Sequence, residues 1–168
     1  MTDPIPEQYR ALVSHFIAQA TEILKEGTAL VPLSFIGCTT TQQIKIVRLD
    51  TQSADSKNTS AGEIAQVARA LRADFVFTLT EAYASPADKA KEAAVFMSRG
   101  GRLSEFPGRL DIVSFTLETP EGCWAAMAPV PPHKPGVPRD MDVSVRFIKV
   151  SDKAGRFFGL LPPAMSRH

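Results

Sequence analysis

The chain has 168 residues, which fits one domain, and its 44% hydrophobic and 22% charged shares are typical of soluble globular proteins. The net charge of +1 argues against a strong nucleic-acid binder, because phosphate affinity comes from many clustered Lys and Arg side chains. With two cysteines, no basic and apolar leader and no apolar run of about 18 residues, we expect a cytoplasmic protein with reduced thiols.

The first predicted element is an amphipathic helix over Pro6–Glu26. Pro6 suits the first turn, where its missing amide costs nothing, and Gly27 suits the position just past the end. The apolar stripe of this helix consists of Tyr9, Leu12, Val13, Phe16, Ala20 and Leu24. Ile17 adds an adjacent line, so the stripe is wider than one sheet contact requires, and we therefore expect a homodimer.

Two strands rich in Val, Ile and Leu follow, over Ala29–Ile36 and Gln43–Asp50. The six-residue connection Gly37–Gln42 is longer than a tight hairpin turn, but strands that are neighbours in sequence are still expected to pair. Pro32 cannot donate a backbone hydrogen bond, which predicts that the first strand lies at a sheet edge or is bulged. The polar stretch Thr51–Asn58 is expected to be an exposed loop.

The span Thr59–Ser85 predicts a helix that leads directly into a strand. Ser60 and Glu63 have the spacing of a capping box at the start of the helix. The apolar stripe behind them consists of Ile64, Val67, Ala68 and Leu71. The strand is indicated by alternation of Phe75, Phe77 and Leu79 with Val76, Thr78 and Thr80. This part of the chain therefore predicts a helix packed on a sheet.

The span 86–109 allows two structures. The Ala, Lys and Glu content of Ala87–Met97 suits a short helix, which Arg99–Arg102 would end. Because its apolar residues are mostly alanine, the whole span could instead be a mobile insertion.

The remaining chain predicts strands interrupted by one proline-rich loop. Leu110–Glu118 and Cys123–Ala128 are separated by a turn with Pro and Gly, so they should pair antiparallel. Five prolines in Pro129–Pro138 exclude a sheet interior and predict an extended loop. Further strands are expected at Met141–Phe147 and Arg156–Leu161, followed by a frayed tail.

This order of elements predicts a single α+β domain over residues 1–168. We expect an antiparallel sheet of about five to seven strands, with two long helices covering one face. The element order resembles the roadblock and profilin-like folds, in which helices flank an antiparallel sheet. The extra C-terminal strands depart from that pattern, and a likeness of fold does not carry a function.

Cys38 is a candidate nucleophile, provided that His15 or His133 lies close enough to lower the pKa of its thiol. The alternative is a small residue in a turn. Cys123 and Trp124 are neighbours on a strand, so they should point to opposite faces, and only one of them is expected in the core.

No metal site or cofactor is expected. The histidines are few and scattered, and no paired Cys or His motif accompanies them. The Gly-Gly pair flanked by Arg99 and Arg102 lacks the spacing of a nucleotide-binding loop.

The function predicted from these patterns is non-enzymatic binding to a protein partner or self-association, in a protein of bacterial or phage type. Loops on a rigid scaffold are where binding residues concentrate. The candidate contact residues are cations of the two loops that interrupt the second half, Arg99, Arg102, Arg109, His133, Lys134 and Arg139.

Two alternatives remain open. One is a small hydrolase or transferase that uses Cys38 or Cys123. The other is weak nucleic-acid binding through the C-terminal half, because residues 85–168 carry 12 basic and 9 acidic side chains against 7 and 9 in residues 1–84.

Overall fold

The computed structural model describes residues 4–142, 144–151 and 157–162. Two short 3₁₀ turns, η1 (Ala87–Lys89) and η2 (Leu103–Glu105), flank the third helix. The helices and strands follow in chain order: α1 Glu7–Lys25, β1 Leu33–Cys38, β2 Gln43–Arg48, α2 Ala54–Leu71, β3 Phe75–Ala84, α3 Ala90–Ser98, β4 Leu110–Thr119, β5 Gly122–Pro129 and β6 Ile148–Val150.

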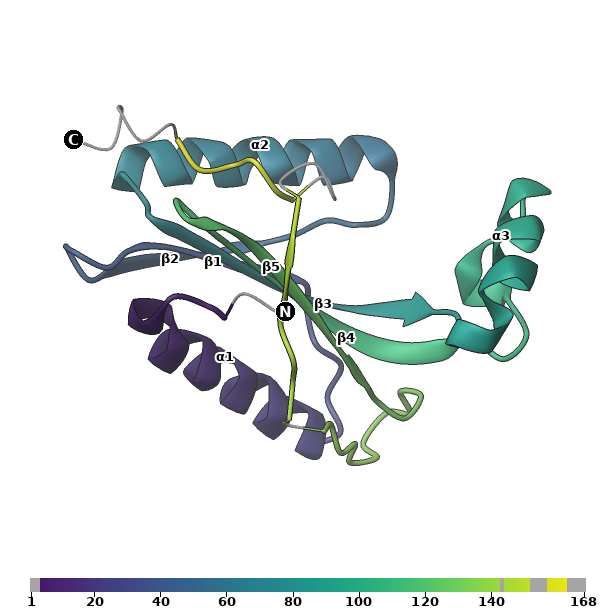
Figure 1. Ribbon diagram of the computed structural model, residues 1–168. Helices are drawn as coiled ribbons and strands as arrows, with labels where there is room; N and C mark the ends of the chain where they lie inside the picture. The colour runs from purple at the N-terminus through teal and green to yellow at the C-terminus, as the bar shows by residue number, and fades with distance from the viewer. Residues whose placement is uncertain (1–3, 143, 152–156, 163–168) are drawn as a thin grey trace.

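The strands form one six-stranded sheet in the order β2-β1-β3-β4-β5-β6, and every neighbouring pair is antiparallel. Figure 1 shows the sheet edge-on with helices above and below it. The predicted α+β class, the antiparallel sheet and its approximate strand number are confirmed. Both predicted hairpins, β1–β2 and β4–β5, are also present.

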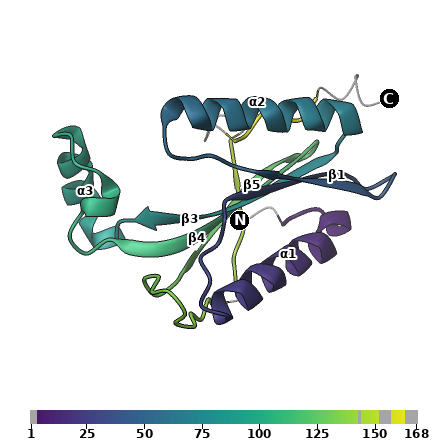
Figure 2. The ribbon, with the colours of Figure 1, turned by 180° about the vertical axis from the view of Figure 1, so that it is seen from behind.

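The two long helices cover opposite faces of the sheet, so the expectation that both cover one face is wrong (Figures 1 and 2). The physical reason is that the central strands are apolar on both sides. One row across the sheet faces α1 and consists of Phe35, Phe77, Leu117 and Trp124. The neighbouring row faces α2 and begins with Ile36 and Val76.

Because both faces are covered, Cys123 and Trp124 are both buried, at 3% and 2% exposure. Their side chains alternate across the sheet as expected. The conclusion that only one of them lies in the core is wrong, since it assumed a single covered face.

Helix α1 matches its prediction. Pro6 lies at the N-cap, and Gly27 adopts a φ of +76° just past the end. At the centre of the helix, the Phe16 ring stacks on Phe35 at 4.1 Å and on Phe77 at 5.2 Å between centroids. These contacts place α1 over the middle strands.

The N-terminal half of α1 is also joined to the β1–β2 turn through Asp74. The Asp74 carboxylate accepts hydrogen bonds from the Tyr9 hydroxyl at 3.2 Å and from the Thr39 backbone N–H at 2.9 Å. The Thr39 hydroxyl donates to the same carboxylate. Burial, followed by the Asp74 charge, raises the pKa of Tyr9 well above its ordinary value.

Helix α2 begins earlier than predicted, and the expected loop at Thr51–Asn58 is largely its first turns. The capping box is formed by Ser53 and Ser56, with a Ser56 N–H to Ser53 Oγ distance of 3.0 Å. Ser60 is instead buried within the helix, where its hydroxyl accepts the Asp50 N–H at 2.9 Å. The first turns are polar because they are exposed on most sides, and a polar helix end resembles a loop in sequence.

Strand β1 lies inside the sheet, between β2 and β3, so the edge position inferred from Pro32 is wrong. Pro32 precedes the strand, and its carbonyl accepts a hydrogen bond from the Leu49 N–H at 2.9 Å. Proline is tolerated there because the strand's own ladder begins at the next residue.

The span 86–109 was predicted to be either a short helix or a mobile insertion, and the short helix is present. Helix α3 with η1 and η2 forms an arm beyond the ends of β3 and β4, away from α1 and α2 (Figure 1). The rings of Phe96 and Phe106 pack 5.6 Å apart within this arm.

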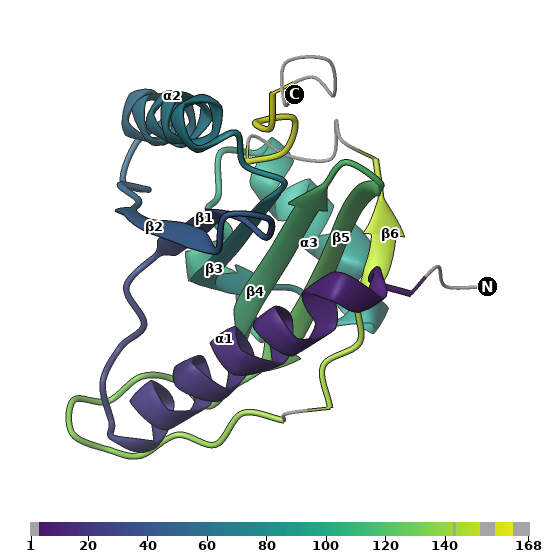
Figure 3. The ribbon, with the colours of Figure 1, turned by 90° about the vertical axis from the view of Figure 1, so that its left-hand side faces the viewer.

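The C-terminal region departs most from prediction. Met141–Phe147 is not a strand in its described residues; it runs alongside α1 toward β6 at the sheet edge (Figure 3). Apolar and polar residues do alternate in this segment. Val145 and Phe147, however, pack against the core on the α1 side and do not join the sheet. The described part of the expected last strand, residues 157–161, forms turns that pack beside α2, while Arg156 and most of the expected frayed tail lie outside the described residues.

A candidate binding groove beside helix α1

An apolar groove separates α1 from the edge of the sheet at β2. Its volume is about 670 Å³. The apolar residues that line it come from α1, the segment before β1, and three strands: Phe16, Ala20, Ile23, Leu30, Val31, Leu33, Phe35, Ile46 and Leu79. The groove therefore has a helix as one wall and a sheet as its floor.

The groove exists because one helix cannot cover the whole face. Phe16 centres α1 over Phe35 and Phe77, which leaves the same face of β2 uncovered. Ile44 and Ile46 on that face are 44% and 60% exposed. A contiguous exposed apolar surface of this kind is typical of an interaction site rather than of a bare monomer surface.

Ionisable side chains flank the groove. His15 and Glu22 of α1, with the C-cap residue Glu26, line one side. Arg48 is exposed and, by strand alternation, shares the face of Ile44 and Ile46 on the other side. Glu22 and Glu26 lie at the C-terminal end of α1, where the helix dipole disfavours acidic groups, so their position is not explained by helix stability. Lys25 offsets part of this cost through a 3.7 Å contact with Glu22.

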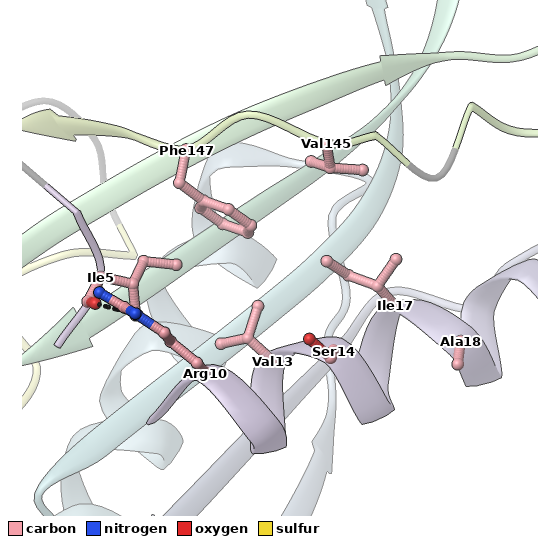
Figure 4. A pocket seen from close by; sticks show the side chains of 8 residues that line it. All are labelled: Ile5, Arg10, Val13, Ser14, Ile17, Ala18, Val145 and Phe147. Carbon is pink, nitrogen blue, oxygen red and sulfur yellow. Dashed lines mark hydrogen bonds between the residues drawn. The ribbon is translucent and has the colours of Figure 1, made fainter. Parts of the chain in front are cut away.

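The opposite side of α1 is covered by the chain itself. Figure 4 shows Val145 and Phe147 facing α1 across a cavity of about 370 Å³, with Val13 and Ile17 on the helix. Ile17 packs against the core here. Ile17, the adjacent line of α1 from which the homodimer was predicted, therefore lies opposite Val145 and Phe147 of the same chain, and the homodimer stays a prediction.

The six predicted contact residues do not form one site. Arg99, Arg102 and Arg109 are exposed on the α3 arm, and the Arg109 guanidinium lies 5.1 Å from the centre of the Tyr83 ring. His133 and Lys134 are exposed in the proline-rich loop. Both loops leave the same end of the sheet, but the arm lies on the α2 side and the proline-rich loop on the α1 side (Figures 1 and 2).

Arg139, the sixth residue, is 1% exposed, so the expectation that it is solvated is wrong. Its guanidinium donates to both carboxylate oxygens of Glu81, at 2.6 and 3.0 Å. The Leu30 N–H donates to the same carboxylate at 2.8 Å. In sequence, a basic residue at the end of a proline-rich loop is expected at the surface, because its partner Glu81 lies on a strand distant in sequence.

Cys38 is buried at the end of β1. Hydrogen bonds from the backbone and side chain of Thr41 lower the pKa of its thiol, against opposing effects of burial and of the Asp74 charge. The groups that act on the thiol are thus turn residues and a carboxylate, not the histidine that the nucleophile hypothesis required. Both cysteines are thiols, and the enzyme alternative stays a prediction.

Within the part of the chain that the structure describes, no three His, Cys, Asp or Glu side chains are grouped closely enough to hold a metal ion. The same residues contain no helix with the length and hydropathy of a membrane span.

The fold and the groove define an α+β protein with a helix on each sheet face and an apolar groove between α1 and β2. No family model, curated protein or solved structure matches the chain, so the resemblance to roadblock and profilin-like folds is not confirmed. The function is therefore inferred from the geometry.

The groove residues Ile23, Val31 and Ile46 are absent from the predicted site. Their sequence signal was ordinary: apolar residues in predicted elements. Only their exposure distinguishes them from core residues, and exposure depends on where α1 lies across the sheet.

Proposed function

We propose that this protein is a non-catalytic interaction protein that binds an amphipathic helix of a partner protein in the groove between α1 and β2. The observation that carries the proposal is the uncovered apolar surface beside α1, with a volume of about 670 Å³. Laying the apolar face of a helix into such a groove is a common mode of polypeptide recognition.

The dimensions of the groove favour a helix. His15 and Glu26 mark its ends along α1. At 1.5 Å per residue this length is about 18 Å, which matches about three turns of a bound helix. A bound helix would lie on β1 and β2 as α1 lies on the middle strands.

The charges of the rim specify the partner further. Glu22 and Glu26 would face basic side chains on one flank of the bound helix. Arg48 would face an acidic side chain on the other flank. Such pairing at a rim contributes more to orientation and association rate than to affinity.

The experiment is a selection of displayed amphipathic helical peptides on the purified protein, followed by fluorescence anisotropy with the enriched peptides. We expect apolar residues at i, i+3, i+4 and i+7, with basic residues along one flank. Val31→Asp should weaken binding at least about tenfold, because Val31 lines the groove and is 39% exposed.

Val95→Asp is the matched control, because Val95 is 50% exposed on the α3 arm and lies outside the groove. The site would lie elsewhere if the peptides bound the Val31 variant as tightly as the wild type. It would also lie elsewhere if only the Val95 variant lost affinity. The cytoplasmic location and the identity of the partner remain predictions.

A further inference from the structure

Strand β2 presents a free sheet edge. Within the described residues, β2 pairs only with β1, whereas the other edge strand, β6, is three residues long. Strand β2 has six residues, with neither proline nor glycine among them. Natural proteins usually shorten, bulge or cover such an edge, because its unpaired backbone groups pair readily with another strand.

The hydrogen-bond pattern shows which residues of β2 present these groups. The Leu49 N–H donates to the Pro32 carbonyl, so the ladder position Pro32–Leu49 is hydrogen-bonded toward β1. Antiparallel ladders alternate, so Lys45 and Val47 also bond inward, while Ile44, Ile46 and Arg48 direct their N–H and C=O groups outward.

We propose that this edge pairs with β2 of a second copy of the chain, antiparallel, about a two-fold axis at Ile46. In that register Ile46 lies opposite its own copy, Ile44 lies opposite Arg48, and Lys45 lies opposite Val47. Each outward-facing residue then meets another outward-facing residue, as hydrogen bonding requires.

The charges of β2 disfavour the neighbouring register at Lys45, and the axis at Ile46 pairs all three outward-facing residues of the strand. Shifting the axis to Lys45 places two lysines directly opposite each other, which is destabilising. The axis at Lys45 also gives fewer hydrogen-bonded pairs between the two strands. In that register Arg48 lies opposite no outward-facing residue of the partner's β2. The axis at Ile46 opposes no like charges and pairs the most exposed isoleucine of the edge, at 60% exposure, with itself.

The proposed dimer does not use the surface from which a homodimer was predicted, since that surface is the apolar stripe of α1 and the proposed contact is the edge of β2. Ile46 also lines the groove, but the dimer requires no bound helix and is tested by mass alone. Each α1 lies over the middle strands of its own copy, so pairing at the edge places no helix over β2 and the groove stays open.

Charge-swapped variants at the axis test the register. Light scattering should give twice the 18.2 kDa chain mass for the wild type at micromolar concentration. Ile46→Lys and Ile46→Glu should each weaken self-association at least about tenfold, because like charges then lie opposite each other. Since Ile46 is exposed, both variants should keep the wild-type circular dichroism spectrum.

An equimolar mixture of the two variants should regain the dimer mass, because Lys then lies opposite Glu. Two folded monomers that stay monomeric when mixed would overturn the proposal, and so would a monomeric wild type. Single variants that remain dimeric would place the contact away from this edge. None of these outcomes depends on helical peptides, so a failure here leaves the groove proposal to be judged by its own experiment.

Discussion

Arg139 and Glu81 form an ion pair that joins the proline-rich loop to β3, with a shortest nitrogen to oxygen distance of 2.6 Å. Arg139 is almost completely buried, and its backbone N–H donates to the Leu24 carbonyl at the end of α1. The Leu30 N–H completes the carboxylate's hydrogen bonds. One pair therefore connects the loop, the helix end and the sheet.

Replacing Arg139 with Met should destabilise the protein by about 2 to 3 kcal/mol. Methionine keeps much of the buried volume but leaves the Glu81 carboxylate with the Leu30 N–H and without its cation. Adding Glu81→Gln should recover part of the loss. Urea denaturation measures both, and Arg109→Met, at an exposed position, should change stability by less than about 0.5 kcal/mol. An equally small effect of Arg139→Met would show that the pair is not stabilising.

The same pair predicts a pH dependence. Burial acts to raise the pKa of Glu81, but hydrogen bonds from Arg139 and Leu30, with the charges of Arg139 and His133, lower it below its ordinary value. A lowered folded pKa gives stability above the unfolded pKa of about 4.3, and this stability is lost as the pH falls through the folded value.

We therefore expect the stability difference between wild type and Arg139→Met to be largest near neutral pH and to shrink below about pH 4. Denaturation curves across this range measure the difference. A constant difference at all pH values would contradict the assignment to Glu81.

Phe16 is expected to be the most sensitive position of α1. Phe16→Ala removes a buried ring that stacks on Phe35 and Phe77, and it should cost about 3 to 5 kcal/mol. His15→Ala, one residue away and exposed, is the control. Comparable losses at both positions would indicate that helix propensity, not packing, dominates.

Both thiols should react slowly in the folded protein. Cys38 and Cys123 are 9% and 3% exposed, so a thiol reagent at neutral pH should label them quickly only after unfolding in urea. Rapid stoichiometric labelling of Cys38 in the native state would revive the enzyme alternative, because hydrogen bonds from Thr41 already favour its thiolate.

The α3 arm should be dispensable for the fold. Strands β3 and β4 pair up to Ala84 and Leu110, so a short Gly-containing turn after these residues can close the hairpin. Residues 86–108 include few core side chains, Ala93 and Phe106. The shortened protein should keep its sheet and helices by circular dichroism, with a loss of at most about 2 kcal/mol in urea. Loss of cooperative unfolding would show that the arm supports the sheet.

The sequence by itself determined the elements whose local pattern agrees with their final environment. Helix α1 has an apolar stripe with a period of 3.6 residues, a proline at its start and a glycine past its end. In β3, β4 and β5 the side chains alternate between the two sheet faces, and turn residues bound the strands. These signals need only neighbouring residues. They also established the α+β class and the two hairpins.

The tertiary structure decided which surfaces are covered. The alternation of residues 141–147 is the same whether they join a sheet or pack beside α1. The exposure of Ile46 and the burial of Arg139 likewise depend on segments distant in sequence: α1 lies over the middle of the sheet and leaves β2 open, while β3 supplies Glu81. Periodicity specifies an apolar face, but the contact that fills it, or leaves it free for a partner, is set only when the layers assemble.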